Sequence, residues 1–146
     1  MVHVSDASDL ARLRAICLAF PSADEGIRQD RPLFHVRRRR FAIFNGDDSP
    51  PRPRWSGFGR SLHFATDPAE RDALRQDPRF RVSPHHGDTQ GWMALDLDAT
   101  DVDWSEIAEL METAYRFVAP RALIAELDTE ADWTEVDTLG ACEHTL

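Results

Sequence analysis

The chain has 146 residues, of which 42% are hydrophobic, and a formal net charge of −9 at pH 7. This length and composition predict one domain with one hydrophobic core. No apolar run approaches the roughly 18 residues that span a bilayer, and the start MVHVSDASDL lacks the basic and apolar regions of a secretory signal, so we expect a cytoplasmic protein with no membrane partner.

The first predicted element is a helix within residues 5–20, SDASDLARLRAICLAF. Leu10, Leu13, Cys17 and Phe20 recur on one face at helical spacing, and Pro21 ends the helix. This apolar face predicts that the helix packs on the core.

Residues 33–44, LFHVRRRRFAIF, predict a β-hairpin. A two-residue turn at Arg38 and Arg39 would place Arg37 opposite Arg40. In that register one face of the hairpin carries Phe34, Val36, Phe41 and Ile43. We expect this apolar face to pack against a helix.

A long polar loop, NGDDSPPRPRWSGFGRS, follows the hairpin and leads to a short strand, SLHFA. Next comes a helix whose ends the sequence specifies. Asp67 is the expected N-cap, Pro68 the first helical residue and Glu70 the capping-box acid, and Pro78 lies beyond the end.

The segment GWMALDLD alternates in polarity as a strand does, and a second capping pair, Asp103 and Glu106, begins the next helix. That helix should bury Ile107, Leu110, Met111, Ala114 and Val118. A last short helix begins at Pro120. Strands joined by hairpins, without βαβ alternation, predict the α+β class, with helices on one face of a mostly antiparallel sheet.

Four segments together are similar to a known family: LRAICLAFPSADE, PLFHVRRRRFAIF, DPRFRVSPHHGDTQGWMALDLD and AYRFVAPRAL. The chain resembles the MmcQ/YjbR family of small bacterial proteins over residues 8–128. The landmarks are Pro21 with Glu25, Phe34 and Val36 before Phe41, the Gly91–Trp92 pair, and Tyr115 before Val118.

The resemblance implies a CyaY-like two-layer α+β fold and a DNA-binding, non-enzymatic role. It divides the chain into an MmcQ/YjbR-like domain, residues 1–128, and an acidic C-terminal extension, residues 129–146. One departure from the family is that Arg37–Arg40 stand where a Gly-rich hairpin turn is usual.

Arginine is concentrated in the middle of the chain, since residues 28–81 hold thirteen arginines and seven acidic residues. Guanidinium groups interleaved with aromatic rings suit phosphates and stacked bases. We therefore predict a nucleic-acid site formed by Arg37, Arg38, Arg39, Arg40, Arg52, Arg54, Trp55 and Arg60. The alternative is that these arginines are solvated and reflect codon usage, because the chain has no lysine.

A second hypothesis is a protein- or small-molecule-binding cleft near Trp92 and Tyr115, with His85 and His86 at its rim. No phosphate-binding loop or nucleophile motif supports an enzyme. We expect no metal and no cofactor, because adjacent histidines rarely converge on one ion.

The two cysteines, Cys17 and Cys142, are too few and too isolated for a disulfide framework or a metal site. We expect both to be free thiols, with Cys17 in the core.

Residues 126–146 carry seven acidic residues and no arginine. They would either screen the arginines of the hairpin or dock on the core through Trp133, Val136 and Leu139. Such an acidic segment is also typical of disorder.

Overall fold

The computed structural model describes residues 2–46, 49–50, 57–84, 91–98 and 102–138, with the backbone alone described for residues 2–8 and 130–138. Within these residues there are four helices and six strands. In chain order they are α1 (Val2–Cys17), β1 (Ala23–Arg28), β2 (Arg31–Val36), β3 (Arg39–Asn45), β4 (Ser61–Phe64), α2 (Pro68–Leu74), β5 (Phe80–Val82), β6 (Met93–Asp96), α3 (Trp104–Val118) and α4 (Arg121–Thr138).

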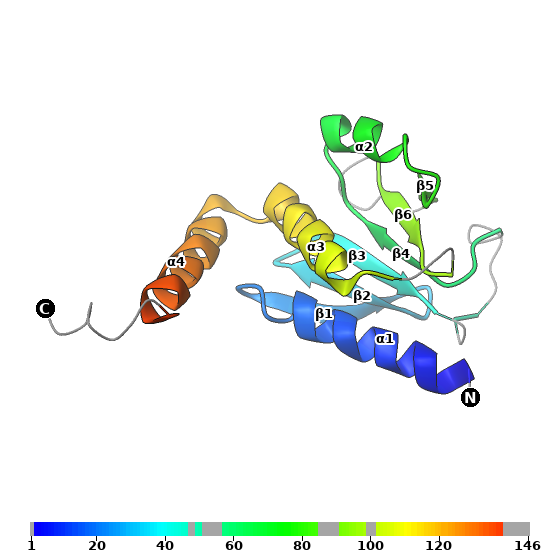
Figure 1. Ribbon diagram of the computed structural model, residues 1–146, viewed down its shortest axis with the longest axis horizontal. Coiled ribbons are helices and arrows are strands. Elements are labelled where there is room, and N and C mark those ends of the chain that lie inside the picture. The colour runs from blue at the N-terminus through cyan, green and yellow to red at the C-terminus, as the bar shows by residue number, and fades with distance from the viewer. Residues whose placement is uncertain (1, 47–48, 51–56, 85–90, 99–101, 139–146) are drawn as a thin grey trace, which may run out of the picture.

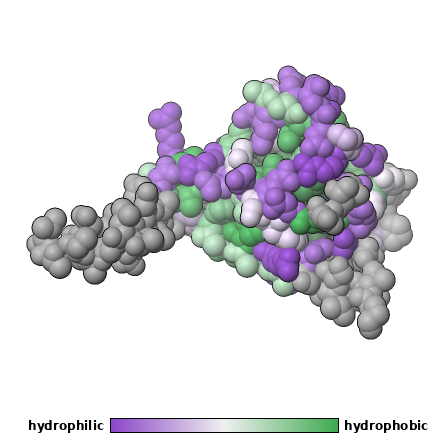
Figure 2. Space-filling view, viewed as in Figure 1, coloured by the Kyte–Doolittle hydropathy of each residue, from purple (hydrophilic) through white to green (hydrophobic). Residues whose placement is uncertain are grey.

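The strands form one antiparallel sheet in the order β1-β2-β3-β4-β6-β5. Helix α3 packs against β3 and α1 packs against α3, so both helices cover one face of the sheet (Figure 1). Hydrophilic side chains cover much of the surface over α2 and α3 (Figure 2). Helix α4 extends away from the sheet (Figure 1). The predicted α+β class is confirmed.

The register of the sheet gathers two apolar rows on the helix-covered face, because residues directly paired across strands point to the same side. Two rows on the helix-covered face are apolar: Phe34, Ala42, Phe64 and Met93, and then Phe44, Leu62, Leu95 and Phe80. All eight are buried. Together with Leu13 and Cys17 from α1 and the inner side of α3, these rows form the core.

The predicted hairpin register is wrong by one residue. The turn is formed by Arg37 and Arg38, so Arg39 pairs with Val36 and Arg40 pairs with His35. The predicted opposition of Arg37 and Arg40 therefore does not occur.

A β-bulge restores part of the predicted pattern. The pairing shifts between Phe34 and His35, which inserts Phe41 as an extra residue in β3. The ring of Phe41 lies 5.8 Å from that of Tyr115 on α3, as expected for the helix-covered face. Ile43, however, pairs with Leu33 and lies on the opposite face, which contradicts the predicted common face.

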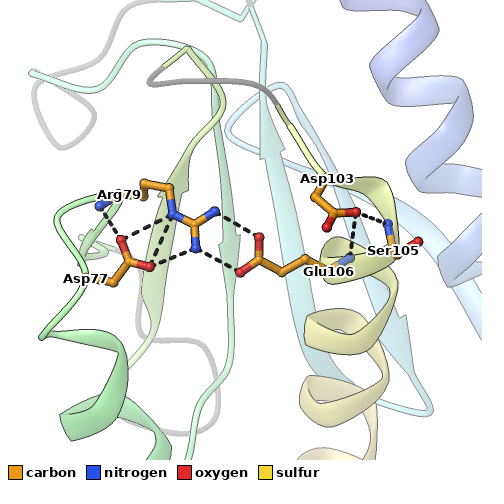
Figure 3. A network of polar contacts seen from close by, with 5 residues as sticks. All are labelled: Asp77, Arg79, Asp103, Ser105 and Glu106. Atoms are coloured by element: carbon orange, nitrogen blue, oxygen red, sulfur yellow. Dashed lines mark hydrogen bonds and ion pairs between the residues drawn. The ribbon is translucent and has the colours of Figure 1, made fainter.

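The aspartate of each predicted capping pair caps its helix, whereas Glu106 binds Arg79 instead of the helix end. The carboxylate of Asp67 accepts a hydrogen bond from the Glu70 amide at 2.8 Å, and that of Asp103 accepts one from the Ser105 amide at 2.9 Å. These caps satisfy amides that would otherwise lack partners at the first turn of each helix. Arg79 then links Asp77 to Glu106 at the start of α3 (Figure 3).

Three elements differ from the sequence-based expectation. Strands β1 and β5 were not predicted: β1 is an edge strand with mostly exposed or half-buried residues, and β5 has only three residues. The predicted short final helix is longer, since α4 runs to Thr138 and so includes part of the acidic segment, for which disorder was one of the alternatives. Cys17 is a buried free thiol, as predicted, whereas Cys142 lies outside the described residues.

Candidate functional site

The β2–β3 turn presents three exposed arginines, Arg37, Arg38 and Arg39. Among the described residues no carboxylate lies within ion-pair distance of any of the three. Arg40, the fourth of the run, is half-buried and belongs to β3. The turn therefore presents three guanidinium groups to solvent that no described residue neutralises.

The backbone of this turn is strained. Arg37 has φ of 58°, the left-handed region that two-residue hairpin turns require and that glycine or asparagine usually fills. A residue with a β-carbon loses about 1–2 kcal/mol there. Three adjacent like charges add repulsion, so this turn departs from what stability alone would select, and such departures concentrate at functional positions.

The remaining predicted nucleic-acid residues are not part of this exposed turn. Arg52, Arg54 and Trp55 lie outside the described residues. Arg60 is only 14% exposed and lies 2.9 Å from the Asp9 carboxylate and 3.2 Å from that of Asp98. Arg60 therefore links α1 to the end of β6 and is not available as a phosphate ligand.

Two of the four residues expected at the predicted ligand cleft lie in the core. Trp92 and Tyr115 are both fully buried. The Tyr115 hydroxyl donates a hydrogen bond to the Pro21 carbonyl at 2.7 Å, so this ring holds the end of the α1–β1 connection. His85 and His86 lie outside the described residues.

Sequence analysis missed a buried polar network on the sheet face away from the helices. His63 in β4 lies between two hydroxyl groups, with its Nε2 2.9 Å from the Ser61 Oγ and its Nδ1 2.7 Å from the Ser83 Oγ. Asn45 donates to the Gly59 carbonyl at 2.7 Å, beside this network. All four polar side chains are buried.

A second buried group anchors the loop that follows β3. Arg31 is 1% exposed and donates from Nε to the Asn45 side-chain oxygen at 2.8 Å and from a terminal nitrogen to the Pro50 carbonyl at 2.6 Å. A buried charge without such acceptors would be strongly unfavourable. Arg31 is therefore structural, although it belongs to the arginine-rich part of the sequence.

The described residues contain neither a cluster of metal-binding side chains nor a helix that could span a membrane. Within residues 2–46, 49–50, 57–84, 91–98 and 102–138, no three histidine, cysteine or acidic side chains are placed to share a metal ion. In the same part of the chain, none of the helices combines the length and apolar character needed to cross a bilayer.

Comparison with known proteins assigns the family. The YjbR family model matches residues 18–117, which is more than half of the chain. The chain belongs to the YjbR family.

A solved structure shares the fold of this YjbR protein. The Deinococcus radiodurans protein DR2400, which contains the family-model domain DUF419, superimposes with a TM-score of 0.58 and 23% sequence identity. The likeness covers 77% of this chain and 80% of the Deinococcus protein. No curated protein matches the chain.

Proposed function

We propose that this YjbR protein binds nucleic acid weakly and without sequence preference through Arg37, Arg38 and Arg39. The observation that carries the proposal is that these three exposed guanidinium groups have no carboxylate partner among the described residues. Guanidinium groups bind phosphate through two parallel N–H donors, and a hairpin tip can approach a nucleic-acid backbone closely.

Four other arginines of the chain are neutralised, and the turn differs from single exposed arginines such as Arg28, Arg75 and Arg121 because it groups three of them. The pairs are Arg14 with Glu25, Arg60 with Asp9 and Asp98, Arg79 with Asp77 and Glu106, and Arg116 with Glu112 and Asp128. Acidic residues are thus available throughout the fold, yet the described ones leave the turn unpaired. This contrast supports a role in contacting an external anion.

The expected affinity for nucleic acid follows from three phosphate contacts, one for each arginine of the turn. Each contact releases about one condensed counterion, so the logarithm of affinity should fall with that of salt concentration by about 0.9 per contact. Nonspecific dissociation constants are of order 10⁻⁴–10⁻⁶ M. The net charge of −9 repels nucleic acid at long range. At physiological salt this repulsion is screened beyond a Debye length of about 8 Å, so the arginines of the turn can still bind phosphate at close range.

In this proposed role the protein is a non-enzymatic binding module of the bacterial cytoplasm, and its partner is DNA or another nucleic acid. The second hypothesis, a cleft near Trp92 and Tyr115, receives no support from these two side chains, because both belong to the core.

Fluorescence anisotropy with labelled random duplex and single strands, at two salt concentrations, tests the proposal. Replacing Arg37, Arg38 and Arg39 together by serine should abolish binding and leave folding intact. A matched control replaces three other exposed arginines, Arg28, Arg75 and Arg121, by serine. Equal losses in both variants would show that net charge alone matters, and unchanged binding in the turn variant would refute the assignment.

A further inference from the structure

A small recess lies on the sheet face away from α1 and α3. It has a volume of about 60 Å³ and is lined by Gly57, Phe58, Gly59, Arg60, Ser61, Arg81, Ala94 and Asp96. These residues come from the start of β4, from β5 and β6, and from the segment before β4. The β2–β3 turn contributes nothing to it, so the recess is separate from the proposed nucleic-acid site.

The guanidinium of Arg81, the positive group of the recess, is held in place without a ligand. Arg81 donates a hydrogen bond to the Gly57 carbonyl at 2.8 Å, and its guanidinium lies 4.3 Å from the centre of the Phe58 ring. Phe58 in turn contacts the buried His63 ring edge-on at 5.1 Å. The other N–H groups of Arg81 have no acceptor among the described residues, so a fixed guanidinium presents free donors.

The floor of the recess is equally fixed. The Ser61 hydroxyl donates to the Gly59 carbonyl at 3.0 Å and lies 2.9 Å from His63, which is held from behind by Ser83. Buried polar groups of this kind lower the stability of the fold unless each of them is hydrogen-bonded. Apolar side chains at the same positions would carry no such requirement. The polar network therefore holds the Ser61 hydroxyl in one position at the floor of the recess.

The recess also carries an anion that does not neutralise the cation. One carboxylate oxygen of Asp96 accepts a hydrogen bond from the Asp98 amide at 2.8 Å, and the other has no partner among the described residues. Arg81 and Asp96 line the same space without forming an ion pair, whereas Arg60 beside them is already bound by Asp9 and Asp98. One positive and one negative group, each with unused hydrogen-bonding capacity among the described residues, therefore face the recess.

We propose that this recess binds a small zwitterion, with its carboxylate on Arg81 and its ammonium on Asp96, as in the head group of a free amino acid. A simple anion would meet the repulsion of Asp96, and a simple cation that of Arg81. Only a ligand that carries both charges satisfies both residues. The small volume restricts the buried part of the ligand to this head group.

An NMR titration of the full-length ¹⁵N-labelled protein tests the proposal, with glycine as the probe and acetate, methylammonium and inorganic phosphate as comparisons. Glycine should give saturable shifts at the amides of residues 57–61, 81 and 94–96, with a dissociation constant of order 10⁻³ M for so few atoms. The three singly charged or anionic probes should bind at least about tenfold more weakly, because each lacks one charge-assisted contact.

Variants locate the site. Arg81→Gln and Asp96→Asn should each weaken glycine binding by about tenfold or more, while the matched changes Arg75→Gln and Asp72→Asn on exposed positions of the α2 region should leave it within about twofold. Both site residues are exposed, so the dispersion of the amide spectrum can verify that each variant is folded.

The contrary outcomes are equally specific. Absence of saturable glycine shifts would overturn the proposal. Equal binding of phosphate or acetate, unaffected or strengthened by Asp96→Asn, would show an anion site and overturn it too. The serine triple variant of the β2–β3 turn should leave glycine binding unchanged, so this site and the nucleic-acid site succeed or fail independently.

Discussion

Arg79 donates two hydrogen bonds to the carboxylate of Glu106, each 2.9 Å long, and so ties the first turn of α3 to the segment before β5 (Figure 3). Glu106 was expected to cap its own helix, but Asp103 alone performs that role. The hydrogen bonds that Arg79 donates to Glu106 raise the pKa of Arg79, and those that it donates to Asp77 raise it further. The sheet and the helix layer are thus joined by charge as well as by apolar packing.

Replacing Glu106 by glutamine should lower the free energy of unfolding by about 1 kcal/mol, the upper range for a partly exposed, two-bond ion pair. Glu109→Gln on the exposed side of the same helix is the matched control and should change it by much less. Urea denaturation at low and high salt measures both. Equal effects of the two substitutions would mean that the link to Arg79 contributes nothing measurable.

Glu70 should make the protein less stable at neutral pH than at pH 4. Burial, and secondarily the charge of Asp67, raises the pKa of Glu70 to about 6, and its Oε1 is buried without a hydrogen-bond partner. Because the folded pKa exceeds the unfolded value of about 4.3, the unfavourable contribution is absent below that value, grows as pH rises, and is complete above about pH 6.

Glu70→Gln should therefore raise the free energy of unfolding at pH 7 by up to about 1 kcal/mol, allowing for the solvent around this half-buried side chain. The gain should vanish near pH 4. Asp72→Asn on the exposed face of α2 is the control. A gain that is the same at both pH values would show that the carboxylate charge is not its cause.

Met111 on α3 is fully buried among the apolar residues of the core. Met111→Ala should lower the free energy of unfolding by roughly 2–5 kcal/mol, because it removes buried apolar surface and leaves a cavity. Chemical denaturation measures the change. A difference within experimental error would mean that α3 does not pack on the sheet in this way.

Deleting residues 129–146 should lower the melting temperature without strengthening nucleic-acid binding. Helix α4 runs to Thr138, and its first part contributes the buried Leu123 and the half-buried Leu127, so the deletion shortens an element that is attached to the core. Thermal unfolding and anisotropy measure the two effects. Tighter binding of the truncated protein at low salt would show instead that the acidic residues screen the β2–β3 turn.

Local sequence signals predicted the helices that begin at a capping residue and the strand whose residues alternate in polarity. Asp67 and Asp103 mark helix starts that the structure confirms, and the alternation around Met93 and Leu95 correctly assigned a strand. The order of helices and strands was then enough for the fold class, because hairpin-linked strands permit few arrangements.

The rest depends on contacts that no local pattern specifies. The bulge at Phe41 moves Ile43 to the other face, and nothing in an unbroken apolar run indicates where one extra residue is inserted. β1 is polar because it lies at the edge of the sheet, so it lacks the alternation of a half-buried strand. Ser61 and Arg81 meet only because β6 lies between their strands, a neighbourhood that sequence spacing cannot show.

The strand order also has a kinetic consequence. Strands β1 to β4 are neighbours in sequence and in space, so each pairing of this meander closes a shorter loop than the pairing of β6 with β4 does. β6 must instead find β4 after the whole α2 and β5 segment has been synthesised, and it is the strand on which β5 depends for its place in the sheet. Non-local pairing of this kind slows folding, so the docking of β6 is the step that we expect to set the folding rate.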